Sequence, residues 1–352
     1  MSGSSLDGLD IAHVQLEEVR GKWSCELLHG ECLPYSDKWL QDLRYAKDLH
    51  VGDFLKLNTA YGRYLGTEIN AFIARHEMAH QVHFIASHGH TVFHEPEHNT
   101  TCQIGDGATI AAVTGLPVIS DLRAMDVALG GQGAPIVPIG DKLLFGDYDY
   151  LLNIGGIANI TMRKGEEVLA FDVCPANQIL NTLAEKEGKA MDEGGAMAAR
   201  GGLIGDVLDE LNNADYYKLP APKSLSNEMA RDLVFPKLLA SDHNIYDLLH
   251  TVTVHIAEQI ANAVKQYPHG KEAANLLATG GGAFNTFLIM QLEKALAPLN
   301  VHVQVPDAGL VKYKEAIVMA LIGALRWREE ENVLASVTGA SRDSVGGAIW
   351  LG

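Results

Sequence analysis

The chain has 352 residues, of which 47% are apolar, so it is long enough for two domains with substantial cores. Its 44 acidic residues outnumber its 27 basic residues, which gives a formal net charge of −17. Such a surface repels nucleic-acid phosphate and anionic membrane, so we expect neither as a partner. A small anionic ligand in a local pocket of amides or cations remains compatible with this charge.

The cysteine pattern indicates a reduced, cytoplasmic protein. No CxxC pair occurs, and no HExxH-type histidine pattern is present, so neither a disulfide framework nor a zinc site is expected. No apolar run reaches the length of a membrane span, and no signal peptide precedes the first motif. The scattered cysteines are Cys25, Cys32, Cys102 and Cys174.

The N-terminal part begins with a loop of glycine and hydroxyl residues over 1–10, followed by a strand over 11–17. Because a loop of this kind usually leaves a strand, we expect the full chain, or its ancestor, to have a few residues before Met1. The Gly/Pro-rich segment 127–138 predicts a domain boundary or rigid crossover. Periodicity predicts helices over 37–48, 51–76 and 107–114, and short strands over 83–87, 92–94 and 116–120.

The stretch 150–177 combines a buried strand, a glycine turn and an acid. An apolar run over 150–152 leads into Asn153–Gly156, and two β-rich runs, 158–163 and 168–172, predict a hairpin. Asp172 is expected at the C-terminal end of the last strand, just before a helix that begins at Asn177. Glycine lets the backbone approach a ligand, and an acid beside a helix N-terminus suits chemistry on an anion.

The remaining elements complete an α/β pattern. Alternating strands and helices occur in two related halves, which predicts an N-terminal domain of 1–138 plus 339–352 and a C-terminal domain of 139–338. The predicted helices cover 177–187, 191–200, 250–266, 286–296 and 314–328, and the predicted strands cover 274–278, 301–305 and part of 337–352.

Three glycine loops are candidates for binding a nucleotide. None contains the lysine of a P-loop, and none is a GxGxxG followed by a spaced acid, so a dinucleotide fold is weakly supported. Each offers backbone amides or hydroxyls that can bind phosphate oxygens without lysine, although a single glycine pair often only makes a turn. Two loops would hold phosphates and the third the base: Ser2–Gly8, Asn153–Gly156 and Gly280–Asn285.

Polar residues at strand ends are candidates for the reaction site. Asp126 could equally cap a helix or pair with Arg123, an alternative that is less favoured for Asp121, and His88 could equally be an ordinary loop histidine. Asp172 is the favoured general base, because it precedes a turn and does not lie on a solvated helix face. The full set is His88, His90, Gln103, Asp121, Arg123, Asp126, Gln132 and Asp172.

Nine motifs spread along nearly the whole chain form a recognisable set. They are SGSSLDGLD, SHGHTVFHEP, QIGD, DLRAMDVALGGQGAPIVP, NIGGIANIT, FD with PAN downstream, PKS, GGGAFN and VTGA. In these motifs the chain resembles the anhydro-N-acetylmuramic acid kinase family of the sugar kinase and actin superfamily. The combination of SGSSLDG, GGQGAPIVP and NIGGIAN is highly specific to that family.

The resemblance implies a two-domain actin-like ATPase fold with its active site between the domains. It implies that ATP and Mg²⁺ are used to open the 1,6-anhydro ring of 1,6-anhydro-N-acetylmuramic acid with water and to phosphorylate O6, in peptidoglycan recycling. Asp172 would activate the water. Mg²⁺ would be carried by ATP, with Asp7 the one side chain considered as its ligand, and a homodimer is compatible with the family.

The resemblance also assigns binding residues. The residues implied for ATP and its phosphates are Ser2, Gly3, Ser4, Ser5, Asp7, Gly8, Asn153, Gly155, Gly156, Gly280, Gly281, Gly282 and Asn285. The residues implied for the sugar are His88, Gln103, Asp121, Arg123 and Asp126.

Several positions depart from the family pattern. Ser4 replaces threonine, His90 replaces glutamine, and Cys174 and Ala176 replace glycines beside the proposed base. A run of arginines is reduced to Arg123 alone, which predicts weaker recognition of the sugar's lactyl carboxylate. Reaction type is therefore a firmer prediction than substrate.

Three alternatives stay open on the residues alone. The first is a kinase for a related anhydro sugar. The second is a non-catalytic sugar- or nucleotide-binding homologue, against which the retained acid and glycine loops count. The third is a Rossmann-type dehydrogenase, against which the missing ribose-binding acid counts.

Overall fold

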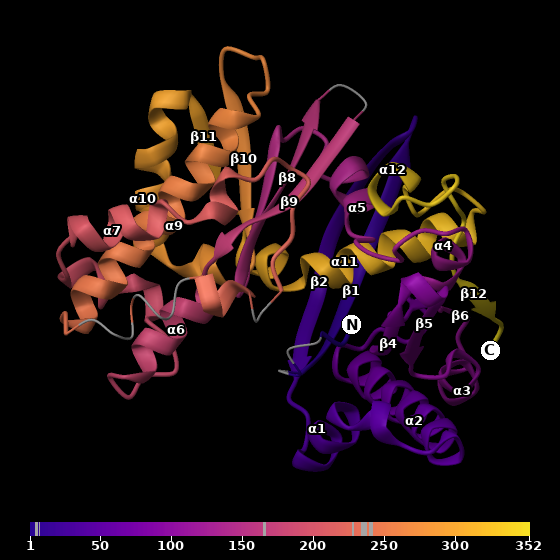
Figure 1. The fold of residues 1–352 in the computed structure, drawn as a ribbon. Helices are drawn as coiled ribbons and strands as arrows, with labels where there is room; N and C mark the ends of the chain where they lie inside the picture. The colour runs from indigo at the N-terminus through magenta and orange to yellow at the C-terminus, as the bar shows by residue number, and fades with distance from the viewer. Residues whose placement is uncertain (4–5, 7, 165–166, 227–228, 234–237, 239–241) are drawn as a thin grey trace. The chain divides into compact units, whose positions relative to one another are not determined.

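The chain divides into two units, which are described separately (Figure 1). Unit 1 comprises Met1–Phe145 and Tyr313–Gly352, and unit 2 comprises Gly146–Lys312. The computed structural model describes residues 1–3, 6, 8–164, 167–226, 229–233, 238 and 242–352. Within these residues, the helices are too short or too polar to cross a membrane.

The unit boundaries differ from the divisions expected after 138 and 338. The larger difference concerns helix α11 (Ala308–Trp327), whose residues from 313 onward group with unit 1. Its apolar side chains Val318 and Leu321 are fully buried in a core that also contains Ile119. Burial of this face holds the helix to unit 1, a tertiary effect that its local sequence does not reveal.

Unit 1 is built from small sheets and the helices that pack on them. A three-stranded sheet has the order β12-β6-β3, and two hairpins, β1-β2 and β4-β5, form separate sheets. The strands are β1 (Leu9–Val19), β2 (Lys22–Leu33), β3 (Ile85–Ala86), β4 (His90–Glu95), β5 (Thr100–Ile104), β6 (Val118–Ser120) and β12 (Ala348–Trp350). Besides α11, the helices are α1 (Asp37–Arg44), α2 (Val51–Arg75), α3 (Gly107–Thr114), α4 (Ala124–Ala128), α5 (Pro138–Leu143) and α12 (Ala335–Thr338).

The predicted helices of unit 1 are confirmed, but only half of its first hairpin is predicted. Strand β1 is longer than the expected 11–17, and β2 lies outside the predicted elements. Along β2, partly buried residues such as Trp23 and Cys25 alternate with exposed ones. That period of two is a strand signal in the sequence itself.

Unit 2 contains a five-stranded mixed sheet in the order β11-β10-β7-β8-β9. Strand β10 is parallel to both β7 and β11, whereas β8 is antiparallel to β7 and β9. The strands are β7 (Tyr150–Ile154), β8 (Ile157–Lys164), β9 (Glu167–Pro175), β10 (Ala274–Thr279) and β11 (Val301–Gln304). The helices are α6 (Asn177–Glu185), α7 (Gly205–Asn212), α9 (Ile245–Gln266) and α10 (Thr286–Leu296).

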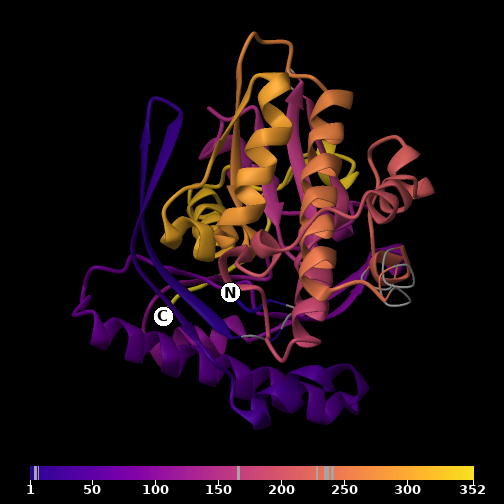
Figure 2. The same cartoon turned by 90° about the vertical axis from the view of Figure 1, so that its left-hand side faces the viewer.

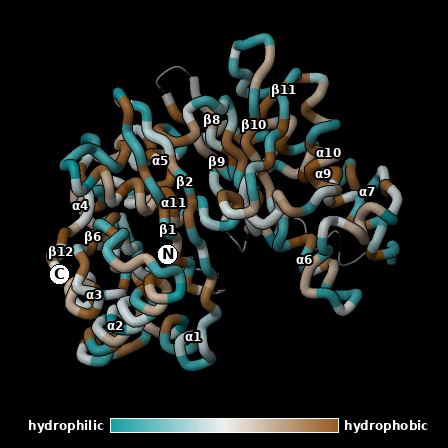
Figure 3. Tube along the Cα trace, turned by 180° about the vertical axis from the view of Figure 1, so that it is seen from behind, coloured by the Kyte–Doolittle hydropathy of each residue, from teal (hydrophilic) through white to brown (hydrophobic). Residues whose placement is uncertain are grey.

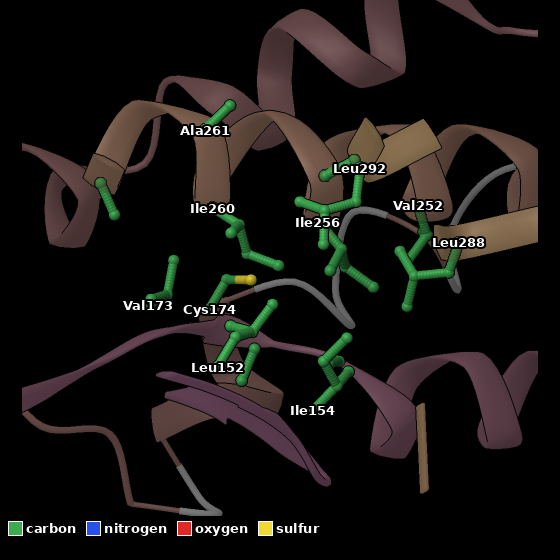
Figure 4. Packing of buried hydrophobic residues seen from close by; sticks show 14 of the residues in the cluster. Leu152, Ile154, Val173, Cys174, Val252, Ile256, Ile260, Ala261, Leu288 and Leu292 are labelled. Carbon is green, nitrogen blue, oxygen red and sulfur yellow. The ribbon is translucent and has the colours of Figure 1, made fainter. Parts of the chain in front are cut away.

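One face of this sheet is covered by helices. Helices α9 and α10 lie side by side over it (Figure 2). Apolar residues at every second strand position, such as Leu152 and Ile160, are fully buried in the same cluster as Ile256 of α9. Figure 4 shows Ile256 and Ile260 of α9 and Leu288 of α10 on the side of the helices that faces Leu152 and Ile154 of β7. The strand period of two therefore leaves the alternate residues on the other face.

Hydropathy follows the same division along the chain. In Figure 3 the loop that joins α9 to β10 is teal, whereas β10 itself is brown. Every residue of β10 except Asn275 is buried. This is the pattern of a strand in the middle of a sheet, with neighbours on both edges.

The expected helix over 191–200 is wrong. The chain there forms two short 3-10 helices, Glu193–Gly195 and Ala198–Arg200. Gly194 and Gly195 have φ values of +63° and +73°, which interrupt a right-handed helix.

Truncation of Ile256 to alanine tests the core of unit 2. This side chain is fully buried between α9 and the sheet, so Ile256→Ala should lower the free energy of unfolding by about 2–5 kcal/mol. Asn262→Ala, on the exposed side of the same helix, should change it by less than about 0.5 kcal/mol. Urea unfolding monitored by circular dichroism measures both, and equal effects would contradict this packing.

Candidate functional site

A row of polar residues crosses three strands of unit 2. Asn153 of β7 is paired with Asn159 of β8, and Asn159 is paired with Asp172 of β9. Directly paired residues lie on the same face of a sheet, and two strand spacings separate the ends of the row by roughly 10 Å. The row lies on the face opposite to that covered by α9, because Leu152 and Ile160 alternate with it.

Two of the predicted glycine loops meet at the carboxyl ends of neighbouring strands. Asn153 is paired with Thr279, so the turn Gly155–Gly156 and the loop that starts at Gly280 leave adjacent parallel strands. A Cβ added to Gly280 would lie 2.5 Å from Oδ1 of Asn153. Such a place, where two loops follow parallel strands, is where open α/β sheets bind ligands.

The donor groups at the start of α6 are already hydrogen-bonded within the protein. The amide of Ala176 donates to the carbonyl of Gly156 over 2.8 Å, and the amide of Asn177 donates to that of Gly155 over 3.0 Å. The side chain of Asn177 also donates to the carbonyl of Ile154, over 3.1 Å. This helix terminus therefore offers an anion fewer free donors than its sequence suggested.

Asp172 lies within β9 and not at its end, because the strand continues to Pro175. The pairing with β8 shifts by one residue beside it, which makes a β-bulge at Val173. A bulge bends its strand and redirects the neighbouring side chains. The Asp172 carboxyl is half-buried, and burial raises its pKa, while a 2.9 Å hydrogen bond from the amide of Leu225 to Oδ2 acts in the opposite direction.

The residues that replace glycines near Asp172 lie in the core of unit 2. Cys174 is fully buried there, and burial raises the pKa of its thiol. Ala176 is also fully buried in this core, and it is the N-cap residue of α6.

Asn285 serves the fold directly. It is the N-cap of α10, and its Oδ1 accepts a 2.9 Å hydrogen bond from the amide of Leu288. Its side chain is buried, and a Cβ on Gly195 would collide with it. The side-chain oxygen predicted to contact adenosine is therefore engaged in a helix cap.

In unit 1, His88 and Arg123 form a buried pair. Nδ1 of His88 lies 3.1 Å from the carbonyl of Gly89, and Nε of Arg123 donates to Nε2 of His88 over 2.9 Å. The imidazole therefore carries its proton on Nδ1. Burial, together with the charge of Arg123, lowers the pKa of His88 to about 3, so the ring is neutral at pH 7.

Arg123 is held in place by a second contact. Its Nη1 donates to the carbonyl of Gly133 over 2.6 Å. Within the part of the chain that the structure describes, its Nη2 has no hydrogen-bond acceptor. The guanidinium is therefore fixed by protein on one side and can present its other edge to a carboxylate.

Asp126 is engaged on both carboxylate oxygens. Oδ1 accepts from the hydroxyl of Thr338 over 2.6 Å, and Oδ2 accepts from the amide of Gly133 over 2.7 Å. A Cβ at Gly131 would collide with Oδ2, so the loop closes tightly around this side chain. These contacts favour the interpretation of Asp126 as a support for the loop that anchors Arg123.

Asp126→Asn should therefore reduce stability more than substrate binding. An amide in place of the carboxylate sets a donor against the Gly133 amide or the Thr338 hydroxyl, which costs about 1–3 kcal/mol of unfolding free energy. Asp121→Asn, at an exposed position, is the matched control and should leave it unchanged. Thermal unfolding measures this, and an unchanged Tm with a raised KM for sugar would instead make Asp126 a substrate ligand.

A buried hydroxyl chain reaches His90. Tyr35 donates to Ser2 over 2.8 Å and lies 2.7 Å from the hydroxyl of Tyr61, and Oγ of Ser2 lies 3.0 Å from Nδ1 of His90. Since Ser2 accepts from Tyr35, its own proton points to His90. Burial lowers the pKa of His90, so this ring is also neutral, and Ser2 contributes to the fold through the same contacts.

Gln103 and Asp121 differ in their surroundings. Gln103 Nε2 donates to Thr101 over 2.8 Å, whereas its Oε1 is buried without a hydrogen-bond partner in the described residues. A Cβ on Gly89 would lie 3.4 Å from Cβ of Gln103, which places Gln103 next to His88. Asp121 follows β6, is exposed, and has a φ of +56°. The orphaned buried oxygen of Gln103 is a group that a sugar hydroxyl could satisfy.

The first glycine loop can be described only in part. Ser4, Ser5 and Asp7, predicted to bind phosphate, lie outside the described residues. Gly3 accepts a 3.3 Å hydrogen bond from Leu6, and a Cβ on Gly8 would lie 2.7 Å from Sγ of Cys32. Gly8 is thus explained by close packing against β2.

The described residues contain no group of three histidine, cysteine or acidic side chains arranged to hold a metal ion. Mg²⁺ that binds together with nucleotide phosphates usually takes only one or two carboxylates from a protein.

Several residues of the site were missed in the sequence. Asn159 lies within the NIGGIANIT motif, and strand periodicity places it on the face of Asn153. Lys223 belongs to the PKS motif, whose role the sequence alone does not specify. Tyr216 and Leu225 contact Asp172 from far along the chain, and no local signal identifies them.

Comparisons with known proteins agree along the whole chain. The family model for anhydro-N-acetylmuramic acid kinase matches residues 1–352. The chain is similar to proteins named anhydro-N-acetylmuramic acid kinase in three bacteria. It is 33% identical to that of Francisella tularensis subsp. novicida over 99% of this chain and 97% of the relative. For Shewanella loihica the values are 34%, 100% and 97%, and for Bacillus cereus they are 30%, 99% and 97%.

Among solved structures, the similarity is low. The structure of xylulose kinase from Rhodospirillum rubrum aligns with a TM-score of 0.36 at 17% identity, over 62% of this chain and 45% of that chain. The assignment therefore rests on the full-length sequence relatives.

Proposed function

The chain belongs to the anhydro-N-acetylmuramic acid kinase family, and from this premise we propose the reaction and the residues that carry it out. It is a kinase, a phosphotransferase with an alcohol group as acceptor. The proposed reaction consumes 1,6-anhydro-N-acetylmuramic acid, ATP and water and yields N-acetylmuramic acid 6-phosphate and ADP. This step returns cell-wall fragments to amino-sugar metabolism, in the cytoplasm where ATP is present.

The proposed mechanism couples two bond changes. Asp172 takes a proton from water as the water oxygen attacks the anomeric carbon. The bond from that carbon to O6 breaks, and O6 attacks the γ-phosphorus of ATP while the bond to ADP breaks. The side chains do little covalent chemistry, since phosphoryl transfer depends mostly on positioning and on stabilising charge.

The observation that carries the proposal is the polar row across β7, β8 and β9. In this row, Asn153, which precedes the proposed phosphate turn, and the proposed base Asp172 share one face of the sheet. Sites on strands hold their groups more precisely than sites on loops. A separation of roughly 10 Å leaves room for a phosphoryl group and a sugar ring between them.

The nucleotide would occupy the two adjacent loops of unit 2. Gly155 and Gly156 are the proposed phosphate contacts, and the loop Gly280–Asn285 the proposed adenosine contact. Mg²⁺, carried by ATP, would neutralise phosphate charge. The cation would need few side chains of this chain, with Asp7 the proposed one.

The sugar would bind the group in unit 1 that contains His88, Gln103 and Arg123. Both ring nitrogens of His88 are engaged within the protein, so its proposed role is to hold Arg123, which would supply the cation for the lactyl carboxylate.

The direct test is a substrate panel with the purified protein. We expect ATP-dependent formation of a sugar 6-phosphate from anhydro-N-acetylmuramic acid, detected by ³¹P NMR and mass spectrometry, with one oxygen from ¹⁸O-water at the anomeric carbon. ATP binding without any sugar phosphate would contradict the kinase assignment and favour a binding homologue.

Arg123 should determine recognition of the lactyl group. Arg123→Met should raise KM for the muramic substrate by about 10–100-fold, because a charge-assisted bidentate contact is worth about 1.5–3 kcal/mol. For 1,6-anhydro-N-acetylglucosamine, the analogue without the lactyl group, the same substitution should raise KM far less. Steady-state kinetics with both sugars measures this, and equal losses would mean that Arg123 serves only the fold around His88 and Gly133.

A further inference from the structure

The PKS motif, Pro222–Ser224, is accounted for neither by nucleotide binding nor by the proposed chemistry. We propose that the segment Tyr216–Leu225 is a clamp that positions Asp172, with Tyr216 and Lys223 as positioning residues. The inference rests on the proposed role of Asp172 as the base. The contacts that define the clamp are independent of that role.

The clamp holds Asp172 through three groups at once. The amide of Asp172 donates to the carbonyl of Lys223 over 3.0 Å, and the hydroxyl of Tyr216 donates to the carbonyl of Asp172 over 2.6 Å. The amide of Leu225 donates to Oδ2 of the carboxylate over 2.9 Å. Backbone and side chain are thus fixed by one segment that begins 44 residues downstream.

The position of Asp172 in the sheet explains why a clamp is needed. Strand β9 is at the edge of the five-stranded sheet, and a bulge beside Asp172 interrupts its pairing with β8. An edge strand next to a bulge has few partners of its own to fix a side chain. The segment pairs with the outer edge of β9 at this residue and supplies them.

Lys223 contacts Tyr216 in two ways. Its Nζ donates to the carbonyl of Tyr216 over 3.1 Å and lies 4.5 Å from the centre of the Tyr216 ring. The ammonium group is half-buried, and burial lowers its pKa. Through these two contacts the lysine restrains the tyrosine that is hydrogen-bonded to Asp172.

The clamp is itself anchored to unit 2. Tyr216 and Leu225 are buried and pack in one cluster with Ile157 at the start of β8. The amide of Ala221 donates to the hydroxyl of Tyr267 over 2.8 Å, and the Tyr267 ring packs against Phe171. Its ends and its middle are therefore fixed to the same sheet as the base.

The clamp leaves the two oxygens of the Asp172 carboxylate in different states. In the described part of the chain, Oδ2 accepts from Leu225 and no donor reaches Oδ1. A hydrogen bond to the charged form stabilises the carboxylate against its burial. The clamp thus opposes the burial that raises the pKa of Asp172, and it engages only one of the two carboxylate oxygens in the described residues.

Kinetics of single variants distinguish a clamp from a phosphate contact. Tyr216→Phe removes only the hydroxyl, whereas Lys223→Met removes the ammonium group, with its charge and its hydrogen bond to the Tyr216 carbonyl. Both should lower kcat by about tenfold or more, with KM for ATP changed less than about twofold, because a misaimed base affects the chemical step. Lys218→Met, an exposed lysine in the same stretch paired with Asp215, is the matched control and should retain full kcat.

The two changes should also be coupled. Because Lys223 acts through Tyr216, the double variant should lose less than the product of the two single losses. A rise in KM for ATP in Lys223→Met, with Tyr216→Phe fully active, would overturn the clamp and make Lys223 a phosphate ligand.

Measurements on the free protein separate this inference from the proposed function. The ¹³C signal of the Asp172 carboxyl gives its pKa by NMR titration, and Leu225→Pro, which removes the amide donor, should raise that pKa, whereas Leu225→Ala should not. The Leu225 amide should exchange with solvent at least about tenfold more slowly in the wild type than in Asp172→Ala, a comparison that does not depend on whether the proline variant folds. Equal exchange rates would overturn the clamp, whether or not Asp172 is catalytic. Full activity of Asp172→Asn would overturn the base assignment and leave these readouts unaffected.

Discussion

Asp172→Asn is expected to reduce kcat for sugar phosphorylation by about 10²–10⁴-fold, the usual contribution of a general base. Asparagine keeps the shape of the side chain and can still accept the Leu225 amide, so the strand and its clamp should be preserved. ATP binding, measured by calorimetry, should be unchanged because the candidate phosphate loops are untouched. Near-normal turnover would show that another group activates water.

The pH dependence of the wild type gives the same test a second readout. Burial raises the pKa of Asp172 above its ordinary value near 3.8. The base works only when ionised, so kcat should fall as pH is lowered through this raised pKa. His88 should cause no further change in kcat near neutral pH, because its pKa is lowered to about 3.

The same shift predicts the effect on stability. A carboxyl whose folded pKa exceeds its unfolded pKa binds more protons when folded, so its contribution to stability falls as pH rises through that interval. At pH 7 the ionised Asp172 therefore destabilises unit 2, and Asp172→Asn should raise its Tm slightly. A variant that is inactive but more stable cannot owe its inactivity to misfolding.

Local sequence patterns predicted much of unit 2 and part of its site. The alternation in NIGGIANIT predicts a strand with Ala158 and Ile160 on one face and Asn159 on the other, and the structure has this arrangement. The pairing of Asp172 with Asn159 then depends on the hairpin register and on a bulge, which no single residue reveals. Asn153 and Asp172, at the ends of the polar row, were therefore singled out from the sequence, whereas Asn159 between them was identified only in the structure.

Other parts depended on contacts between distant residues. Asp126 and Asn285 are polar residues beside predicted site loops. Oδ1 of Asp126, however, accepts a hydrogen bond from the hydroxyl of Thr338, and Oδ1 of Asn285 accepts one from the amide of Leu288. On the sequence alone a capping role is open for Asp126, whereas Asn285 is assigned only to the nucleotide. Competition between a ligand and the protein's own donors can be judged only when those donors are located.

Unit boundaries were predicted poorly for a similar reason. Helix α11 spans the division after Lys312, and its residues from Tyr313 onward bury apolar side chains in the core of unit 1. Its apolar sequence predicts burial without specifying the partner. The Gly/Pro-rich segment before Pro138 marks a turn in the chain rather than the observed division after Phe145.

The glycines of the two loops in unit 2 fall into two classes that mutations should separate. Gly280 has a φ of +80°, and a Cβ there would lie 2.8 Å from the carbonyl oxygen of Ile154. A Cβ on Gly282 would collide with Cγ2 of Ile154. These two glycines are required by the fold itself, through backbone conformation or close packing.

Gly155 and Gly281 are not required in this way. Their φ values are not in the left-handed region, and the nearest atoms to an added Cβ are 3.4 Å and 3.6 Å away, ordinary contact distances. The protein alone would tolerate alanine at both positions. A glycine that the fold does not need is explained if another molecule, here the nucleotide, approaches the backbone closely.

Gly155→Ala and Gly281→Ala should therefore leave Tm unchanged or slightly raised and weaken ATP binding by about tenfold or more, equivalent to about 1.4 kcal/mol. Gly282→Ala should instead lower the unfolding free energy by about 1–3 kcal/mol, because the added methyl overpacks the loop against Ile154. Thermal unfolding with and without ATP measures both quantities in one experiment. If Gly155→Ala and Gly281→Ala bind ATP like the wild type, the nucleotide does not touch these loops. If Gly282→Ala then loses ATP affinity without losing stability, the division between the two classes is wrong as well.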